Sequence, residues 1–121
     1  MQYVLLIYGD ENGWKGRSEE ERAQVFQAYG AFTEEVRSAG AMKGGDALQP
    51  TQTATTVRVR NGETLTTDGP FAETKEQLGG FYIIEAASLD EAIEWAAKIP
   101  GASHGSVEVR PVMDFEQEGS A

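Results

Sequence analysis

Three features of the sequence predict an α+β fold built on one antiparallel sheet. Two apolar runs, residues 3–8 (YVLLIY) and 81–86 (FYIIEA), have the length and composition of buried strands. Two Ser-x-x-Glu segments, at residues 18–21 and 88–91, carry the start signal of a helix. Asn61-Gly62 indicates a hairpin, because both central residues of a type I′ turn need a positive φ. The predicted order is strand, helix, strand, strand, helix, strand, with a hairpin inserted.

The first third of the chain is predicted to hold one strand and one long helix. Residues 3–8 are apolar at every position, which is typical of a strand covered on both faces. Residues 9–17 (GDENGWKGR) are predicted to be a glycine-rich loop. Ser18 begins the helix and Gly40 ends it. The predicted apolar stripe of this helix consists of Val25, Phe26, Tyr29, Phe32, Thr33 and Val36.

The middle of the chain is predicted to form a second strand and then the hairpin. Residues 44–46 (GGD) indicate a bend or bulge in the second strand. In residues 53–60 (TATTVRVR), Val57 and Val59 alternate with two arginines, which predicts a strand with one apolar face. Residues 63–67 (ETLTT) are expected to return as its partner.

The last third is predicted to contain a strand, a helix and a final strand. Gly79-Gly80 indicates a bulge at the entry to the strand at residues 81–86, and close approach of the backbone to a ligand or partner is the alternative. The second helix starts at Ser88 and is closed by Pro100-Gly101. Residues 106–112 (SVEVRPV) alternate as the final strand, and the acidic tail at 113–121 is predicted to be flexible. We expect one domain over residues 1–121, a length sufficient for a core.

This element order predicts the ferredoxin-like βαββαβ arrangement, an antiparallel sheet with two helices on one face and a β-hairpin around Asn61-Gly62. The other face of such a sheet is bare in a single copy. Residues 3–8 and 81–86 are too apolar for a face in contact with water. We therefore expect two copies to pack sheet against sheet as a homodimer.

Composition argues against several classes of function. The chain has 20 acidic and 10 basic side chains, a net charge of −10, and its basic residues are scattered. Nucleic-acid binding needs clustered positive charge, so it is not expected. No apolar run approaches the roughly 20 residues that span a bilayer, and the first residues do not resemble a signal peptide. With no cysteine, the chain cannot form disulfides or thiolate metal sites, which agrees with a cytoplasmic protein without metal or cofactor.

The polar loop before residues 81–86 holds the first candidate site. Asp68 is the candidate catalytic residue, since a carboxylate on a loop above an apolar strand suits general acid or base chemistry. The alternative is structural: Asp-Gly-Pro is a turn in which Asp bonds its own backbone. Phe71 is expected to anchor the loop in an apolar pocket. Glu73, Lys75 and Glu76 are predicted to form a polar rim around a ligand, with ordinary surface charge as the alternative.

Three further candidate ligand-binding residues lie outside this loop. Arg58, with Arg60 beside it, can hold a carboxylate or phosphate through paired hydrogen bonds, and charge balance against nearby Glu is the alternative. Tyr82 can line a cleft, although core packing is the usual role of such a residue. His104 is the only imidazole and can act as an isolated base. Without a second His or a Cys it does not make a metal site.

The segment TDGPFAETKEQLGGFYIIE, residues 67–85, closely resembles the YCII-related proteins of the DGPF subgroup, which are small bacterial proteins. YVLLIYGDE, AYGAFTEEVRSAG, TVRVRNG and GSVEVRPV extend this resemblance over essentially the whole chain. It implies a ferredoxin-like fold assembled as a dimeric α+β barrel. Subgroup members are often encoded beside extracytoplasmic-function sigma factors, which implies a possible regulatory association.

The wider YCII-like family includes proposed enzymes. The resemblance implies acid/base chemistry by a His near the first helix and an Asp, on small oxo-acid-like or chlorinated aromatic-derived compounds. This chain has no His between Ser18 and Ala39, so that pair of residues does not carry over.

Two functions therefore stay open, and the sequence does not decide whether the protein is an enzyme. In the first, a homodimer binds a small anionic or enolic metabolite near the DGPF tetrapeptide, with acid/base catalysis by Asp68. That hypothesis predicts a cavity beside Asp68. In the alternative, the protein is a non-catalytic interaction or regulatory protein, accessory to a sigma factor. It predicts a filled interior, an Asp68 held in its turn and an exposed patch.

Overall fold

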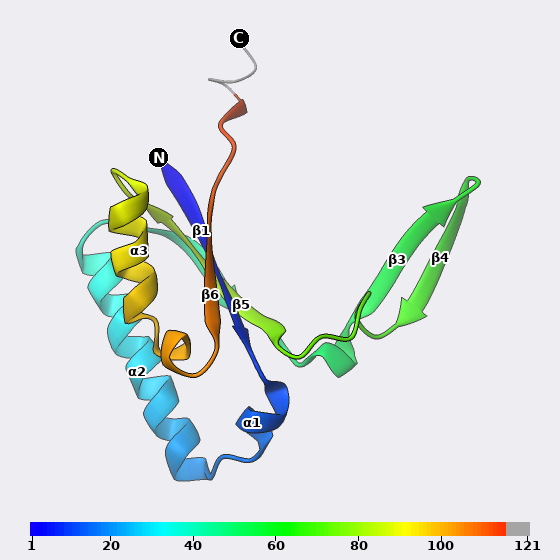
Figure 1. The fold of residues 1–121 in the computed structure, drawn as a ribbon, viewed down its shortest axis with the longest axis horizontal. Helices are drawn as coiled ribbons and strands as arrows, with labels where there is room; N and C mark the ends of the chain where they lie inside the picture. The colour runs from blue at the N-terminus through cyan, green and yellow to red at the C-terminus, as the bar shows by residue number, and fades with distance from the viewer. Residues whose placement is uncertain (116–121) are drawn as a thin grey trace.

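The computed structural model of the chain describes residues 1–115, so residues 116–121 of the predicted tail lie outside the described residues. Four antiparallel strands form the main sheet in the spatial order β2-β5-β1-β6. Two helices, α2 and α3, lie together on one side of it (Figure 1). The predicted ferredoxin-like α+β fold is confirmed. The elements of this body are β1 (Gln2–Gly9), α2 (Glu19–Ser38), β2 (Met42–Ala47), β5 (Gln77–Glu85), α3 (Leu89–Lys98) and β6 (Ser106–Pro111).

The core lies between the helices and the face of the sheet that they cover. Strands β1 and β5 are central, and their register pairs Tyr3 with Ile84 and Leu5 with Tyr82. Alternate residues of a strand point to opposite faces, so these positions all face the helices. The most completely buried side chains are Leu5, Val36, Ile84 and Ile99.

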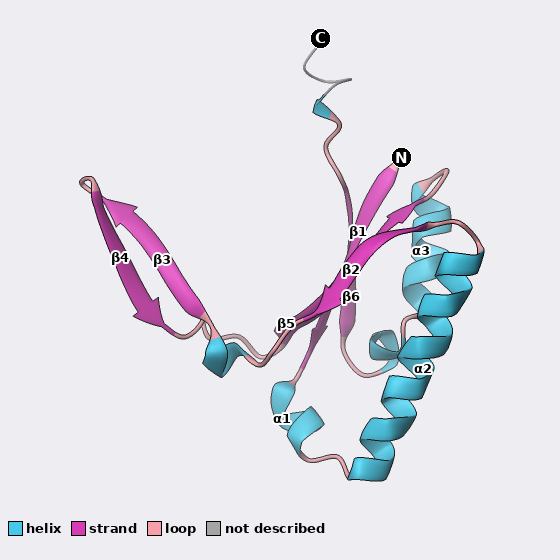
Figure 2. Cartoon of the chain, turned by 180° about the vertical axis from the view of Figure 1, so that it is seen from behind, coloured by secondary structure: helices cyan, strands magenta, loops and turns pink. Residues whose placement is uncertain are grey.

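The opposite face of the same two strands is also apolar, but no element covers it in Figure 2. Register places Val4 beside Ile83 and Leu6 beside Phe81 on this face. All four are half-buried, and none of them packs against the core cluster. We call these four residues the open face of the sheet. The double-sided apolar pattern predicted for the central strands is thus present, with one side lacking a cover in the single chain.

The capping signal at Ser18 folds as predicted. The Glu21 backbone N–H donates to Ser18 Oγ at 3.1 Å, and the Ser18 N–H donates to Glu21 Oε1 at 3.0 Å. The hydrogen bond from the Ser18 backbone N–H to the Glu21 carboxylate is the main cause that lowers the pKa of this carboxyl. At α3 only half of this arrangement forms: Ser88 Oγ accepts from the Glu91 N–H, but the Glu91 carboxylate accepts from the Ala87 N–H instead.

Two expectations for the first third of the chain were wrong. The predicted loop contains a short helix, α1 (Glu11–Lys15), which Asp10 caps by accepting from the Asn12 N–H at 2.9 Å. Its single turn contains Asn12 and Gly13, both weak helix formers, so propensity gave no signal. Phe26, predicted to face the core, is 67% exposed. It packs edge-on against Trp14 of α1, with ring centres 5.5 Å apart.

The predicted hairpin forms a second, separate sheet. Strands β3 (Thr55–Arg60) and β4 (Glu63–Asp68) pair only with each other. Asn61 and Gly62 have φ of 52° and 79°, as a type I′ turn requires. The hairpin projects away from the body (Figure 1), and we call residues 55–68 the hairpin arm. Short 3-10 helices precede it, as η1 (Thr51–Thr53), and follow α3, as η2 (Pro100–Ser103).

The bulge predicted at Gly79-Gly80 is present, because the β1–β5 register skips Gly79, but it lies inside β5, which begins at Gln77 and not at residue 81. The irregularity predicted for residues 44–46 lies just before them, because the β2–β5 register shifts between Met42 and Gly44. Within residues 1–115, no helix has both the length and the apolar character needed to cross a bilayer.

We predict that Ile84→Ala lowers the free energy of unfolding by about 2–5 kcal/mol, because it opens a cavity at a fully buried site. Ile93→Ala on α3 is the matched control, since Ile93 is 48% exposed. Urea unfolding followed by circular dichroism measures both. If both variants lost the same free energy of unfolding, Ile84 would not lie in the core.

Candidate functional site

The DGPF loop, residues 68–71, closes the base of the hairpin arm. Asp68 is the last residue of β4. Next to it, the Gly69 N–H donates to the Ala54 carbonyl at 2.7 Å, and Thr56 Oγ1 donates to the Gly69 carbonyl at 2.8 Å. Gly69 has a φ of 102°, which side-chain-bearing residues rarely adopt. The tetrapeptide is therefore the point at which the chain leaves β4 and turns back towards the body.

The Asp68 side chain takes no part in holding this turn. Backbone groups of Gly69 and the hydroxyl of Thr56 make the closing hydrogen bonds. Among the described residues, no hydrogen bond or ion pair involves the Asp68 carboxylate, which is exposed. The structural alternative is right that Asp-Gly-Pro forms a turn with a positive φ at Gly69, but its expectation that Asp68 bonds its own backbone is wrong. The carboxylate is available for a ligand or a partner.

The rest of the loop is exposed. The Phe71 side chain is 79% exposed, so the expectation that it anchors the loop in an apolar pocket is wrong for the single chain. Glu73 and Lys75 are also exposed, in the segment that leads into β5. Their predicted role as a rim around a ligand stays a prediction. Together with Asp68, these residues form one open, polar stretch at the base of the arm.

Arg58 lies on the arm but does not converge with Asp68. In the hairpin, Arg58 is paired with Leu65, and Asp68 with Thr55. Residues paired across two strands share a face, and odd and even positions alternate. Arg58 and Asp68 therefore point to opposite faces of the arm. A ligand held by both would have to wrap around the edge of the hairpin.

Tyr82 belongs to the core side of the sheet. Its hydroxyl shares a hydrogen bond with Thr33 of α2 at 2.9 Å, and its ring meets Phe32 edge-on, with centres 5.1 Å apart. Nearby, the Tyr29 hydroxyl accepts from the Gly101 N–H at 3.1 Å, and burial raises the pKa of this phenol. The structure thus places Tyr82 on the side of the sheet that faces α2, apart from the arm.

His104 follows η2 and is exposed. Two residues later, the Ser106 hydroxyl donates to Glu76 Oε1 at 2.9 Å. Residues 69–76 connect β4 to β5, and Glu76 is the last of them. The Ser106–Glu76 bond therefore brings the loop that carries His104 to the end of this segment that is farther from Asp68. The structure therefore groups Asp68, Phe71, Glu73 and Lys75 on one loop, leaves His104 beyond its end, and separates Arg58 and Tyr82 from it.

The sequence did not reveal a polar latch that fixes the base of the arm. Glu11 of α1 accepts two hydrogen bonds from Thr51 of η1, from its N–H and its hydroxyl, both at 2.8 Å. The Glu11 N–H donates to Gln77 Oε1 at 3.0 Å, and Gln77 Nε2 donates to the Thr74 carbonyl. The residues joined by Glu11 are 40 and 66 positions away, so no local pattern could indicate the contact.

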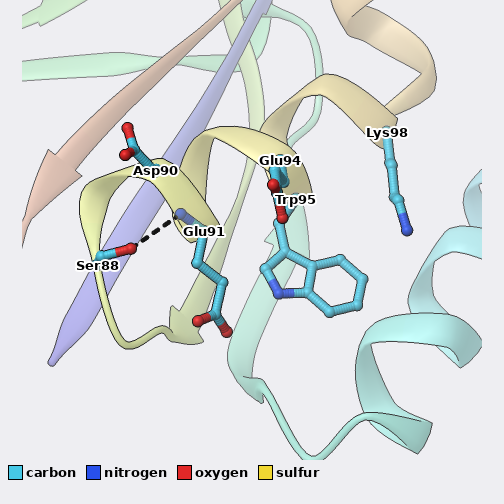
Figure 3. A pocket seen from close by; sticks show the side chains of 6 residues that line it. All are labelled: Ser88, Asp90, Glu91, Glu94, Trp95 and Lys98. Carbon is cyan, nitrogen blue, oxygen red and sulfur yellow. Dashed lines mark hydrogen bonds between the residues drawn. The ribbon is translucent and has the colours of Figure 1, made fainter.

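Two hollows of the surface lie away from the DGPF loop. One, of about 450 Å³, runs along α3 beside Trp95 (Figure 3). Glu91 in this hollow accepts from the Ala87 N–H, and Lys98 is paired with Glu35 of α2 at 2.6 Å. A second hollow, of about 360 Å³, adjoins it near Met1 and Glu85. Neither includes a residue of the DGPF loop, which lies at the other end of the β1–β5 pair.

Chemically, this exposed stretch offers the free carboxylates of Asp68 and Glu73 and the ammonium group of Lys75, without an enclosing apolar wall in the single chain. The cavity that the metabolite hypothesis predicts beside Asp68 is not among these hollows. Across residues 1–115, no group of three or more His, Cys, Asp or Glu side chains is placed to hold a metal ion.

Comparison with known proteins shows the family of this chain. The family model described as the YCII-related domain matches residues 1–116. The chain belongs to the YCII-related family. An uncharacterised protein of Rhizobium meliloti (strain 1021) is 46% identical to it over 114 residues, covering 93% of this chain and 92% of the relative. This YCII-related protein therefore spans nearly the full length of that relative.

We predict that Gly69→Ala loosens the arm of this YCII-related protein without loosening its core. A side chain at a φ of 102° is strained by about 1–3 kcal/mol, so amides of β3 and β4 should exchange about fivefold faster or more. Hydrogen exchange measured by mass spectrometry resolves the arm from the body. Gly79→Ala is the control, because φ at Gly79 is not positive and its nearest neighbour lies 3.9 Å from the added Cβ. Unchanged exchange in the arm of Gly69→Ala would contradict the role of Gly69.

Proposed function

We propose that this YCII-related protein acts as a homodimer, in which two copies pack through the open faces of their sheets. The observation that supports this is the row of apolar side chains on the uncovered side of the central strands, Val4, Leu6, Phe81 and Ile83. Burying one side chain of this size stabilises an assembly by roughly 1.5–3 kcal/mol. A two-fold interface uses the same patch on both copies, so one apolar face suffices.

We further propose that a small anionic or enolic metabolite binds beside the DGPF loop, where Asp68 acts as general acid or base. The free Asp68 carboxylate supports this role, because the turn is closed by other groups. Lys75, in the segment that joins the DGPF loop to β5, supplies a positive charge to an anionic ligand. Phe71, 79% exposed, supplies an apolar surface. A site of this kind needs an enclosing wall, which the second copy provides in the proposed homodimer.

The alternative is a non-catalytic interaction or regulatory protein, accessory to an extracytoplasmic-function sigma factor. The exposed apolar side chains of the arm and the loop favour it, since Val57, Val59 and Phe71 are 58%, 60% and 79% exposed. Apolar surface gathered in one place often marks an interaction site. In this alternative Asp68 contributes charge to a protein interface and no turnover occurs.

We predict that Ile83→Glu shifts the protein from dimer to monomer at micromolar concentration. An unpaired carboxylate in the dimer interface costs several kcal/mol, whereas in the monomer it is solvated. Sedimentation velocity measures the change, and circular dichroism checks that the variant is folded. Ile93→Glu on α3 is the control and is expected to remain dimeric, since Ile93 is exposed on the helix layer. A monomeric wild type would contradict the homodimer directly.

A thermal-shift screen of carboxylic, enolic and phosphorylated metabolites tests the site. A ligand at 100 times its dissociation constant adds about 2.7 kcal/mol, a shift of several degrees in a domain of this size. We expect a shift with the wild type that Asp68→Asn loses and Glu63→Gln keeps, because Glu63 lies at the arm tip on the face opposite Asp68. If a ligand raises the melting temperature of the wild type, Asp68→Asn and Glu63→Gln equally, Asp68 does not bind it. Absence of any shift would favour the interaction protein.

A further inference from the structure

The hairpin arm is held at its base. In the part of the chain that the structure describes, no hydrogen bond or ion pair joins residues 57–67 to the sheet or to the helices. Every residue of β4 is exposed. Isolated two-stranded hairpins are marginally stable in water, and an apolar face needs a packing partner. The arm therefore has a shape and a composition that the single chain does not explain.

The two faces of the arm differ in character. The register pairs Val57 with Thr66 and Val59 with Thr64, so these four β-branched residues share one face. We call it the valine face, and it carries no charge except Asp68 at the base. The opposite face carries Arg58, Arg60 and Glu63 around Leu65. Only the valine face can be buried without desolvating a row of charges.

The arm leaves the body on the side of the sheet that the helices do not cover. In Figures 1 and 2 the sheet stands between α2 and α3 on one side and the arm on the other. The open face of the sheet looks towards this same side, because its residues alternate with those buried under the helices. A body seated on the open face would lie beside the arm.

The exposed surface area of the single chain is larger than that of a compact monomer of the same mass, as expected for one subunit of an assembly. The chain exposes 8525 Å², whereas a compact monomer of 13.1 kDa exposes about 6,400 Å². If residues 116–121 contributed all the surface of an extended chain, they would account for roughly 900 Å² of the difference. More than about 1,000 Å² would remain, and a standard protein interface buries about 800 Å² on each partner.

We propose that the hairpin arm is a clasp whose valine face packs against a second copy of this chain. The inference rests on the proposed homodimer and extends it. The open faces bring the two copies together, and the valine face of each arm then packs against the body of the other copy. Because Asp68 lies on the valine face, at the base of the arm, the clasp also brings the partner's surface up to this carboxylate. The candidate site is then completed by the second copy.

The absence of cysteine makes a direct test possible. Val59→Cys and Leu65→Cys each introduce one thiol, on opposite faces of the same hairpin. The rate of each variant with a maleimide is compared with the rate of the same variant diluted until the copies separate, because Arg58 lies opposite position 65 and favours the thiolate there. In the clasped dimer Val59→Cys reacts at least about tenfold more slowly than after dilution, because burial removes access to the thiolate, whereas Leu65→Cys reacts equally fast in both states. Sedimentation velocity of each unlabelled variant reports its assembly.

Three outcomes separate this inference from the proposed function. A dimer in which Val59→Cys is protected and Leu65→Cys is open supports the clasp, and the protection should be lost when dilution separates the copies. A dimer in which both thiols react at the rates of an exposed arm overturns the clasp and leaves the homodimer intact. A monomer at all concentrations overturns both, including a monomer with a protected thiol, in which the arm folds onto its own body.

Discussion

Strands β1 and β5 carry apolar side chains on both faces, and most of the architecture depends on this constraint. On one face, Tyr3, Leu5 and Ile84 are buried under α2 and α3. On the other face, Val4 and Phe81 belong to a row that no described element covers. The chain supplies one helix layer, and we propose that a second copy covers the other apolar face. The uncovered apolar face is the physical basis of the assembly that we propose.

The DGPF loop divides structural and chemical roles between adjacent residues. Gly69 supplies the unusual backbone angle, and Thr56 and Ala54 supply the hydrogen bonds that close the arm. The latch between Glu11 and Thr51 then joins the base of the arm to α1. Since these groups hold the turn, the Asp68 carboxylate is left free. A polar side chain beside a rigid turn is well placed for binding, because little conformational entropy is lost when it meets a ligand.

Assembly and chemistry are linked in this picture by the geometry of one hairpin. Val57 and Val59 share a face of the arm with Asp68. Asp68 is paired with Thr55, and residues 55, 57 and 59 are alternate positions of one strand. A surface that packs on this face necessarily approaches Asp68 as well. The clasp that we propose would therefore account for both the exposed valines and the exposed Asp68, because the partner would contact both.

The sequence by itself determined the element order, the helix start at Ser18, the type I′ turn at Asn61-Gly62 and the apolar strands, because local spacing and turn chemistry encode these features. It also indicated the DGPF loop as the candidate site. It missed α1, whose single turn has weak helix formers, and it misplaced Phe26 and Phe71, whose surroundings depend on distant segments. Only the tertiary structure decided that Tyr82 faces the helices, that Glu11 latches Thr51, and that Asp68 is free. These facts depend on contacts between residues far apart in the chain, which packing determines and no local pattern records.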